Sequence, residues 1–270
     1  MGIPRTGARL RLVKRIFLAL LVAAPLLALG QASFTLDYPS AIAKAGRQRM
    51  LAEYMMKEYL QLAEGIGDAS ARGHLAEAIW VFDDQVGDLK GFKPTPELEK
   101  TVAELAAQWL EFRKIITTPP SRAAVTALRA TGARLHEAAE RNTAALVSAS
   151  GSSLGRIVGL AGRQRMLSQR IAKTYLLLSA RVDEAAAREE LQAAREQFEA
   201  AQRELSALPG NTDEINAALA GVQSEWAKLD RMIRAERLDR ALRKSVIESA
   251  DNILSRMENV TAMYTRLAQR

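Results

Sequence analysis

The sequence has 270 residues, a formal net charge of +7 and no cysteine. Five of the positive charges lie within residues 1–32, which contain no acidic residue, so the rest of the chain carries only +2. This balance argues against nucleic-acid binding, and the lack of cysteine excludes disulfides, thiol catalysis and thiolate metal sites. Ala, Leu, Arg, Glu and Gln dominate whereas aromatic and β-branched residues are sparse, which predicts an all-α fold.

Residues 1–32 have the pattern of a secretory signal peptide. A basic segment precedes the apolar run 16–29, and small residues follow it around Ala32. The run contains Pro25 and is shorter than the roughly 20 apolar residues that a membrane span needs. We therefore expect a periplasmic protein that is cleaved near Ala32. The alternative is an uncleaved N-terminal helix that anchors the protein in the inner membrane.

A heptapeptide occurs twice without change. The sequence AGRQRML at residues 45–51 recurs 116 residues later, at 161–167. Matching residues continue downstream at similar spacing, for example Trp109 and Trp226 after one inserted residue. Such matching indicates an internal duplication. We place the first repeat at residues 39–150 and the second at residues 153–270.

Turn residues divide each repeat into four predicted helices. Two breaks in the second repeat are weak, whereas those with Gly or Pro are strong, and Ser121 and Thr212 are expected helix caps. The breaks fall, in chain order, at residues 65–68, 91–96, 119–121, 181–183, 209–211 and 235–238. Four helices joined by short connections predict an up-down four-helix bundle in each repeat.

The segment Gly151–Ser153 between the repeats allows two arrangements. If it is only a kink, residues 121–180 form one rod that stacks the bundles end to end and keeps Arg49 far from Arg165. If it is a break, the two motif helices can face each other in a pseudo-dimer within the chain. We expect the rod, and with it two separate sites, each of which could pair with its counterpart in a homodimer.

Each motif places an arginine on the seam of an amphipathic helix. Apolar residues recur at alternating steps of three and four, and Arg49 and Arg165 stand where this pattern calls for a hydrophobic residue. A buried arginine is costly unless an anion pairs with it, and its planar fork suits a planar oxyanion. The partner can be an internal Asp or Glu or a bound anion, and the residues alone leave both open. The small residues expected around the two arginines are Ala45 and Gly46 in the first motif and Ala161, Gly162 and Ser168 in the second.

The other polar residues offer no catalytic set. No Ser-His-Asp set, phosphate loop or histidine ligand pair is present, so we expect no enzyme, no cofactor and no metal site. We expect Trp109 and Trp226 in the core. We expect solvated helix faces at Asp83, Asp84, Glu189 and Glu190, and surface or satisfied core positions for His74 and His136. The other motif arginines, expected to pair with neighbouring helices or solvent, are Arg47, Arg163 and Arg170.

Residues 161–173, AGRQRMLSQRIAK, resemble the signature of the N-terminal sensor domain of the type IV pilus methyl-accepting chemotaxis transducer, the PilJ type. They are also similar to the P-box of the nitrate/nitrite sensor kinases and to the motif of nitrate-sensing NIT domains. The resemblance implies a helical-bundle sensor that binds nitrate or nitrite through Arg165 and, in the first copy, Arg49. The first repeat departs after Leu51, so we expect weaker binding there.

The resemblance implies a periplasmic ligand-binding protein that recognises a small oxyanion and reports to a membrane sensor or transducer. The sequence lacks a HAMP-like segment and a second span, so we expect a sensor domain detached from its output. The alternative is a ligand-free structural or interaction module that partners a membrane chemotaxis, pilus or sensor-kinase component. Titration of the protein with anions separates the two.

Overall fold

In a computed structural model, which describes residues 36–269, the chain forms eight α-helices and no strand within that range. The helices are α1 (Tyr38–Ala63), α2 (Ala69–Gly91), α3 (Pro96–Ile116), α4 (Arg122–Ser150), α5 (Ser153–Ser179), α6 (Glu184–Ser206), α7 (Asp213–Arg234) and α8 (Arg240–Ala268). The all-α prediction is confirmed. The predicted signal peptide lies outside the described residues.

The helix boundaries follow the turn chemistry of the sequence. Ser121 and Thr212 cap α4 and α7, since their hydroxyls accept hydrogen bonds from the backbone N–H groups of Ala124 and Ile215. Both caps were predicted. The weakly signalled breaks in the second repeat are also real, and their backbone turns through left-handed residues such as Asp183 and Glu236.

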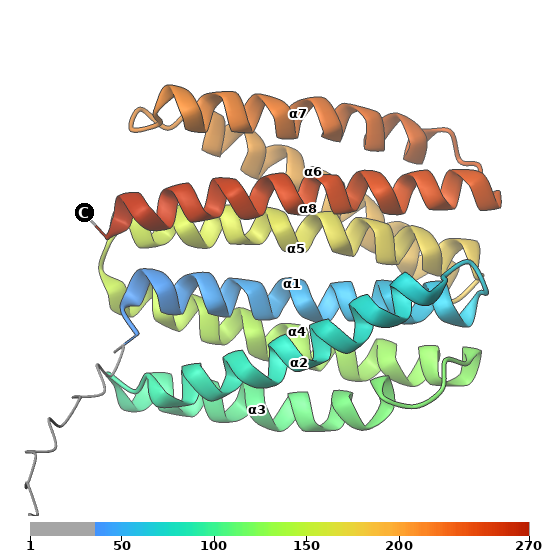
Figure 1. Cartoon of the computed structure of the whole chain (residues 1–270), viewed down its shortest axis with the longest axis horizontal. Coiled ribbons are helices and arrows are strands. Elements are labelled where there is room, and N and C mark those ends of the chain that lie inside the picture. The colour runs from blue at the N-terminus through green and yellow to red at the C-terminus, as the bar shows by residue number, and fades with distance from the viewer. Residues whose placement is uncertain (1–35, 270) are drawn as a thin grey trace, which may run out of the picture. The chain divides into compact units, whose positions relative to one another are not determined.

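The helices form two four-helix sets that lie side by side (Figure 1). In the first set α1 contacts α2 and α4, and α3 closes the bundle; in the second set α5, α6, α7 and α8 repeat this arrangement. Corresponding helices have nearly equal lengths, such as 29 residues in both α4 and α8. Among the eight described helices, the most extensive interface joins α1 to α5, which run in the same direction.

The predicted rod over residues 121–180 is wrong. Gly151 adopts a left-handed conformation with φ 57° and ends α4, while the hydroxyl of Ser152 accepts from the backbone N–H of Gly155 and caps α5. The chain therefore reverses direction between the two repeats. The stacked arrangement is excluded, and the motif helices face each other within one chain as a pseudo-dimer.

The predicted core tryptophans are buried in both repeats. Trp109 stacks on Phe82 with ring centroids 4.1 Å apart, and Trp226 stacks on Phe198 at 4.4 Å. Each pair joins the second and third helices of its repeat. Equivalent aromatic pairs thus join equivalent helices in the two repeats.

Candidate functional site

The two copies of the heptapeptide meet at paired glycines. A Cβ atom on Gly46 would lie 3.7 Å from the Cα of Gly162, and one on Gly162 would lie 3.6 Å from the Cα of Gly46. Ala45 and Ala161 are completely buried beside them. The small residues therefore allow α1 and α5 to approach closely, as their positions in the motif predicted.

The seam arginines reach across this contact to the opposite helix. Arg49 Nη2 donates to the backbone carbonyl of Gly159 at 3.1 Å, and Arg165 Nη2 donates to that of Ala43 at 3.2 Å. The two acceptors are 116 residues apart, the same offset as the motifs, so the bonds are related by the symmetry of the pseudo-dimer. Arg49 and Arg165 are 3% and 5% exposed, which confirms that both point inward.

The carboxylate partners of the two arginines differ. Arg49 Nη1 donates to the carboxylate of Glu140 at 2.9 Å. Glu258 occupies the same place in α8 that Glu140 occupies in α4, but it pairs with Arg47 at 3.5 Å. Within residues 36–269, no carboxylate lies within 4.0 Å of Arg165. An internal carboxylate therefore satisfies one seam arginine and not the other.

The local electrostatics reflect this difference. Burial lowers the pKa of Arg165 to about 10, and the nearby charges of Glu258 and Arg47 act in opposite directions on it. Burial also lowers the pKa of Arg49, but Glu140 opposes the shift by its charge and hydrogen bond. The Nε atoms of both arginines are buried without a partner in the described part of the chain. Arg165 thus remains a buried cation at neutral pH with unused donor capacity.

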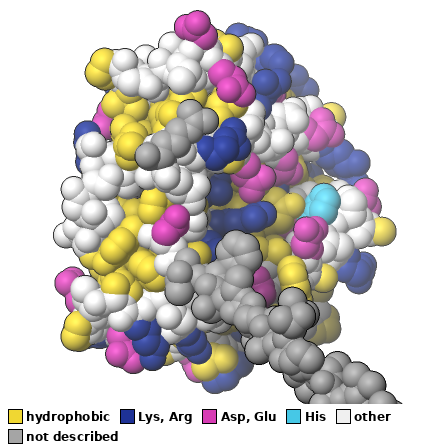
Figure 2. All heavy atoms as spheres, turned by 60° about the vertical axis from the view of Figure 1, so that its left-hand side comes forward, with side chains coloured by type: hydrophobic (Ala, Val, Ile, Leu, Met, Phe, Trp, Pro, Cys, Tyr) yellow, Lys and Arg dark blue, Asp and Glu magenta, His cyan; other side chains and the backbone are white. Residues whose placement is uncertain are grey.

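Arg165 borders a hollow of about 550 Å³ between the N-terminal part of α1 and the C-terminal part of α8, here called the Arg165 hollow. Its other charged residues are Arg47, Arg266 and Glu258, and its walls include Thr265. Positive charge therefore predominates in its lining. Figure 2 turns this end of the helices forward and shows basic side chains beside acidic ones near the middle of the face.

The structure thus brings together six of the seven residues that the sequence assigned to the site. The seventh, Ser168, is also buried, but its hydroxyl donates to the backbone carbonyl of Arg165 at 2.8 Å within α5. The remaining motif arginines behave as expected, because Arg163 donates to Gln197 and Arg170 pairs with Glu53. The role of the seven residues in binding stays a prediction.

Sequence reasoning missed a second polar cluster at the α1–α5 interface. The buried carboxylate of Glu53 accepts from Arg170 at 2.8 Å and from Lys173 at 2.7 Å, so charges from the second repeat hold a carboxylate of the first. Burial acts to raise the pKa of Glu53, but Lys173 and Arg170 together hold it far below its usual range. Burial lowers the pKa of the adjacent His136 to about 4.

Two acidic residues expected on solvated faces also have structural partners. Glu190 pairs with Lys173 at 2.7 Å, and Asp83 accepts from the Trp109 indole N–H at 2.6 Å. Asp83 is exposed, as predicted, whereas Glu190 is partly buried, and a residue pair such as Asp-Asp does not indicate which neighbouring helix supplies a donor. The signal that could have revealed the cluster around Glu53 was a difference between the repeats, since Glu53 stands where the second repeat has Gln169.

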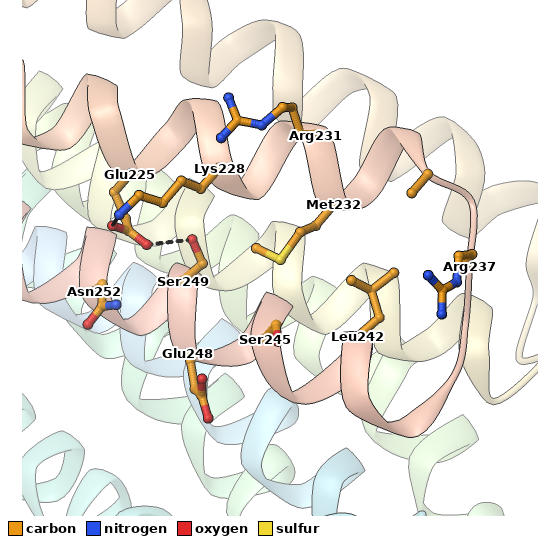
Figure 3. Close-up of a pocket in the computed structure, with 11 residues that line it drawn as sticks. Glu225, Lys228, Arg231, Met232, Arg237, Leu242, Ser245, Glu248, Ser249 and Asn252 are labelled. Atoms are coloured by element: carbon orange, nitrogen blue, oxygen red, sulfur yellow. Dashed lines mark hydrogen bonds and ion pairs between the residues drawn. The ribbon is translucent and has the colours of Figure 1, made fainter.

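Another hollow, of about 420 Å³, lies between α7 and α8, and Figure 3 shows the two pairs that Glu225 makes in its wall. Glu225 accepts from the Ser249 hydroxyl at 2.8 Å and from Lys228 at 3.0 Å. No residue of either heptapeptide lines it. Within residues 36–269, no group of three or more His, Cys, Asp or Glu side chains is placed to hold a metal ion.

The protein is thus a helical-bundle module, built from two four-helix repeats with a polar interface between them. Residues 39–140 and 138–255 match the family model described as type IV pili methyl-accepting chemotaxis transducer N-term, PilJ. The chain therefore belongs to the PilJ family, whose N-terminal domains are sensory or interaction modules. The two segments confirm tandem copies, whereas the bounds predicted for each repeat stay a prediction.

The remaining comparisons add no relative. No curated protein and no solved structure matches the chain at a significant level. Across residues 36–269, no helix combines the length and the apolar character required to cross a bilayer. Any functional assignment therefore rests on the family match and on the geometry of the seam arginines.

Proposed function

We propose that the protein is a periplasmic sensor module that binds one small planar oxyanion, nitrate or nitrite, at the α1–α5 interface. The observation that carries this proposal is Arg165, a buried cation that donates to a backbone carbonyl and has no carboxylate within 4.0 Å among residues 36–269. Leaving such a charge unpaired costs free energy, so a bound anion would supply the countercharge that the protein itself does not.

The charges at the interface favour a monovalent ligand. Arg49 and Arg165 contribute two positive charges, and Glu140 contributes one negative charge through its bond to Arg49. One monovalent anion neutralises this set, whereas sulfate would leave excess negative charge in a buried site. Nitrate and nitrite also present two coplanar oxygens, which suit the parallel N–H donors of a guanidinium group.

We further propose that the module reports to a membrane chemotaxis transducer or sensor kinase. Its membership of the PilJ family and the predicted signal peptide support this partner and an extracytoplasmic location. The α1–α5 interface is the element that a ligand would affect, because the proposed site lies between the two repeats.

Calorimetric titration of the whole chain with nitrate, nitrite, chloride and sulfate tests the ligand. We expect one nitrate or nitrite per chain. Arg165→Ala removes a charge-assisted pair worth about 2–4 kcal/mol, so affinity should fall at least about 30-fold. Arg49→Ala should reduce affinity less, because Glu140 already occupies part of that guanidinium. Arg163→Ala is the matched control, since Arg163 belongs to the same motif but bonds to Gln197.

Two outcomes contradict this proposal. Nitrate binding by Arg165→Ala at the affinity of the parent protein would show that the site lies elsewhere. Absence of binding of every tested anion to the parent protein would instead favour the ligand-free interaction module.

A further inference from the structure

We propose that the anion reaches Arg165 from one side only, through the Arg165 hollow, and that Arg266 and Arg165 give this hollow the positive charge that attracts it. The inference rests on the proposed function and adds the route of the ligand. The site would then admit its ligand from one side, although the two repeats are related by pseudo-symmetry.

The first support is the position of Arg165 itself. Its side chain is only 5% exposed, yet it contributes to the wall of a hollow of about 550 Å³. Arg47 and Arg266 line the same space, and Glu258 is the one acidic residue among the lining side chains. Since Glu258 pairs with Arg47, Arg266 and Arg165 give the hollow its net positive charge.

The second support is the opposite side of the pseudo-dimer, where two corresponding residues leave less room and less positive charge. Val147 stands where the Arg165 hollow has Thr265, and a Cβ on Gly159 would lie 3.0 Å from its Cγ2. Ser148 replaces Arg266. A close-packed valine and a neutral serine provide neither room nor attraction for an anion.

The third support is the carboxylate on each side. On the closed side Glu140 bonds directly to the seam arginine, at 2.9 Å from Arg49 Nη1. The carboxylate of Glu140 would repel an anion that approaches Arg49 from the closed side. On the open side Glu258 is held by Arg47, which leaves the approach to Arg165 to positive side chains. Fields of this kind raise the rate at which a small anion arrives.

Site-specific blocking tests the route, because the sequence has no cysteine. Ala262 lines the Arg165 hollow, and Ala144 occupies the corresponding exposed position on the closed side. We would prepare Ala262→Cys and Ala144→Cys in the whole chain and attach a polyethylene-glycol maleimide to each. Exchange of isotope-labelled nitrate, followed by NMR, should slow at least about tenfold in labelled Ala262→Cys. Labelled Ala144→Cys should exchange like the unlabelled protein.

A charge variant gives an independent measurement. Arg266→Gln should slow nitrate association about threefold or more at low ionic strength, and the difference should vanish at high salt. Arg163→Gln, which removes an arginine on the closed side, should leave the rate unchanged. Nitrate binding with equal exchange in both labelled variants would overturn the route alone. Failure of the parent protein to bind nitrate would overturn the proposed function, and the route with it.

Discussion

The two repeats share a fold and a seven-residue motif, yet their buried charges are arranged differently. Both repeats insert a seam arginine across the Gly46–Gly162 contact onto a backbone carbonyl of the other repeat. Among residues 36–269, only Arg49 then pairs with a carboxylate, because Glu258 pairs with Arg47. The duplicated backbone thus keeps its packing symmetry, whereas single ion pairs determine which seam arginine lacks a carboxylate partner.

The same contrast occurs farther along α1 and α5. The first repeat contributes the carboxylate of Glu53, whereas the second has the neutral Gln169 at the matching position and supplies the cations Arg170 and Lys173. The interface is therefore held by charges that are complementary between the repeats rather than repeated in each.

The largest expected effect on the free energy of unfolding is that of substituting Glu53. Glu53→Ala leaves Arg170 and Lys173 without their shared buried carboxylate, so the free energy of unfolding should fall by about 3–5 kcal/mol. Gln169→Ala is the matched variant and should cost about 1 kcal/mol, because it removes a neutral hydrogen bond to the carbonyl of Ala250. Urea denaturation measures both. Equal losses in the two variants would contradict the asymmetry.

The next effect is a pH dependence that one repeat alone supplies. The folded protein holds the pKa of His136 at about 4, below the ordinary value of 6.5, so the unfolded chain binds this proton more readily. Its contribution to stability is therefore complete above pH 6.5 and is lost as the pH falls toward 4. Between pH 6.5 and 4.5 the loss should reach about 2 kcal/mol.

Denaturant titrations across this pH range check the His136 effect. His136→Gln should flatten the dependence, whereas variation of the other histidine, by His74→Gln, should leave it in place. A slope that survives His136→Gln would assign the proton uptake to another group.

The smallest expected effect has opposite signs in the two repeats. Without an anion, Arg165→Met removes a buried unpaired charge and should raise the free energy of unfolding by about 1 kcal/mol. Arg49→Met should lower it by a similar amount, because Glu140 loses its partner. Saturating nitrate should stabilise the parent protein but not Arg165→Met, which reverses their order. Thermal unfolding with and without nitrate gives both comparisons; a common sign for the two variants would show that the arginines are equivalent.

The sequence was sufficient for the helices and for the inward arginines, because those follow from local patterns. Turn residues and caps such as Ser121 set the boundaries, and a polar residue on an apolar seam identified Arg49 and Arg165. The direction of the chain at Gly151 was not predictable in this way, because glycine both kinks helices and ends them.

The partners of the arginines were also beyond sequence reasoning. Glu140 and Glu258 are equivalent in position, and nothing in their neighbours along the chain shows that one bonds to Arg49 and the other to Arg47. That choice depends on side-chain geometry across three helices. The contrast between Glu53 and Gln169 was visible in the repeat comparison, but its partners Arg170 and Lys173 were not identifiable before the two repeats were placed together.

The short connection at Gly151 and Ser152 has a consequence for how the site can change. In a dimer of identical chains, every substitution alters both half-sites at once, and assembly depends on protein concentration. Here the covalent link holds α1 against α5 at a fixed effective concentration, so the interface forms in a single molecule at any dilution. Each half-site can then acquire its own substitutions, and one half can specialise in holding the helices together while the other remains open to solutes.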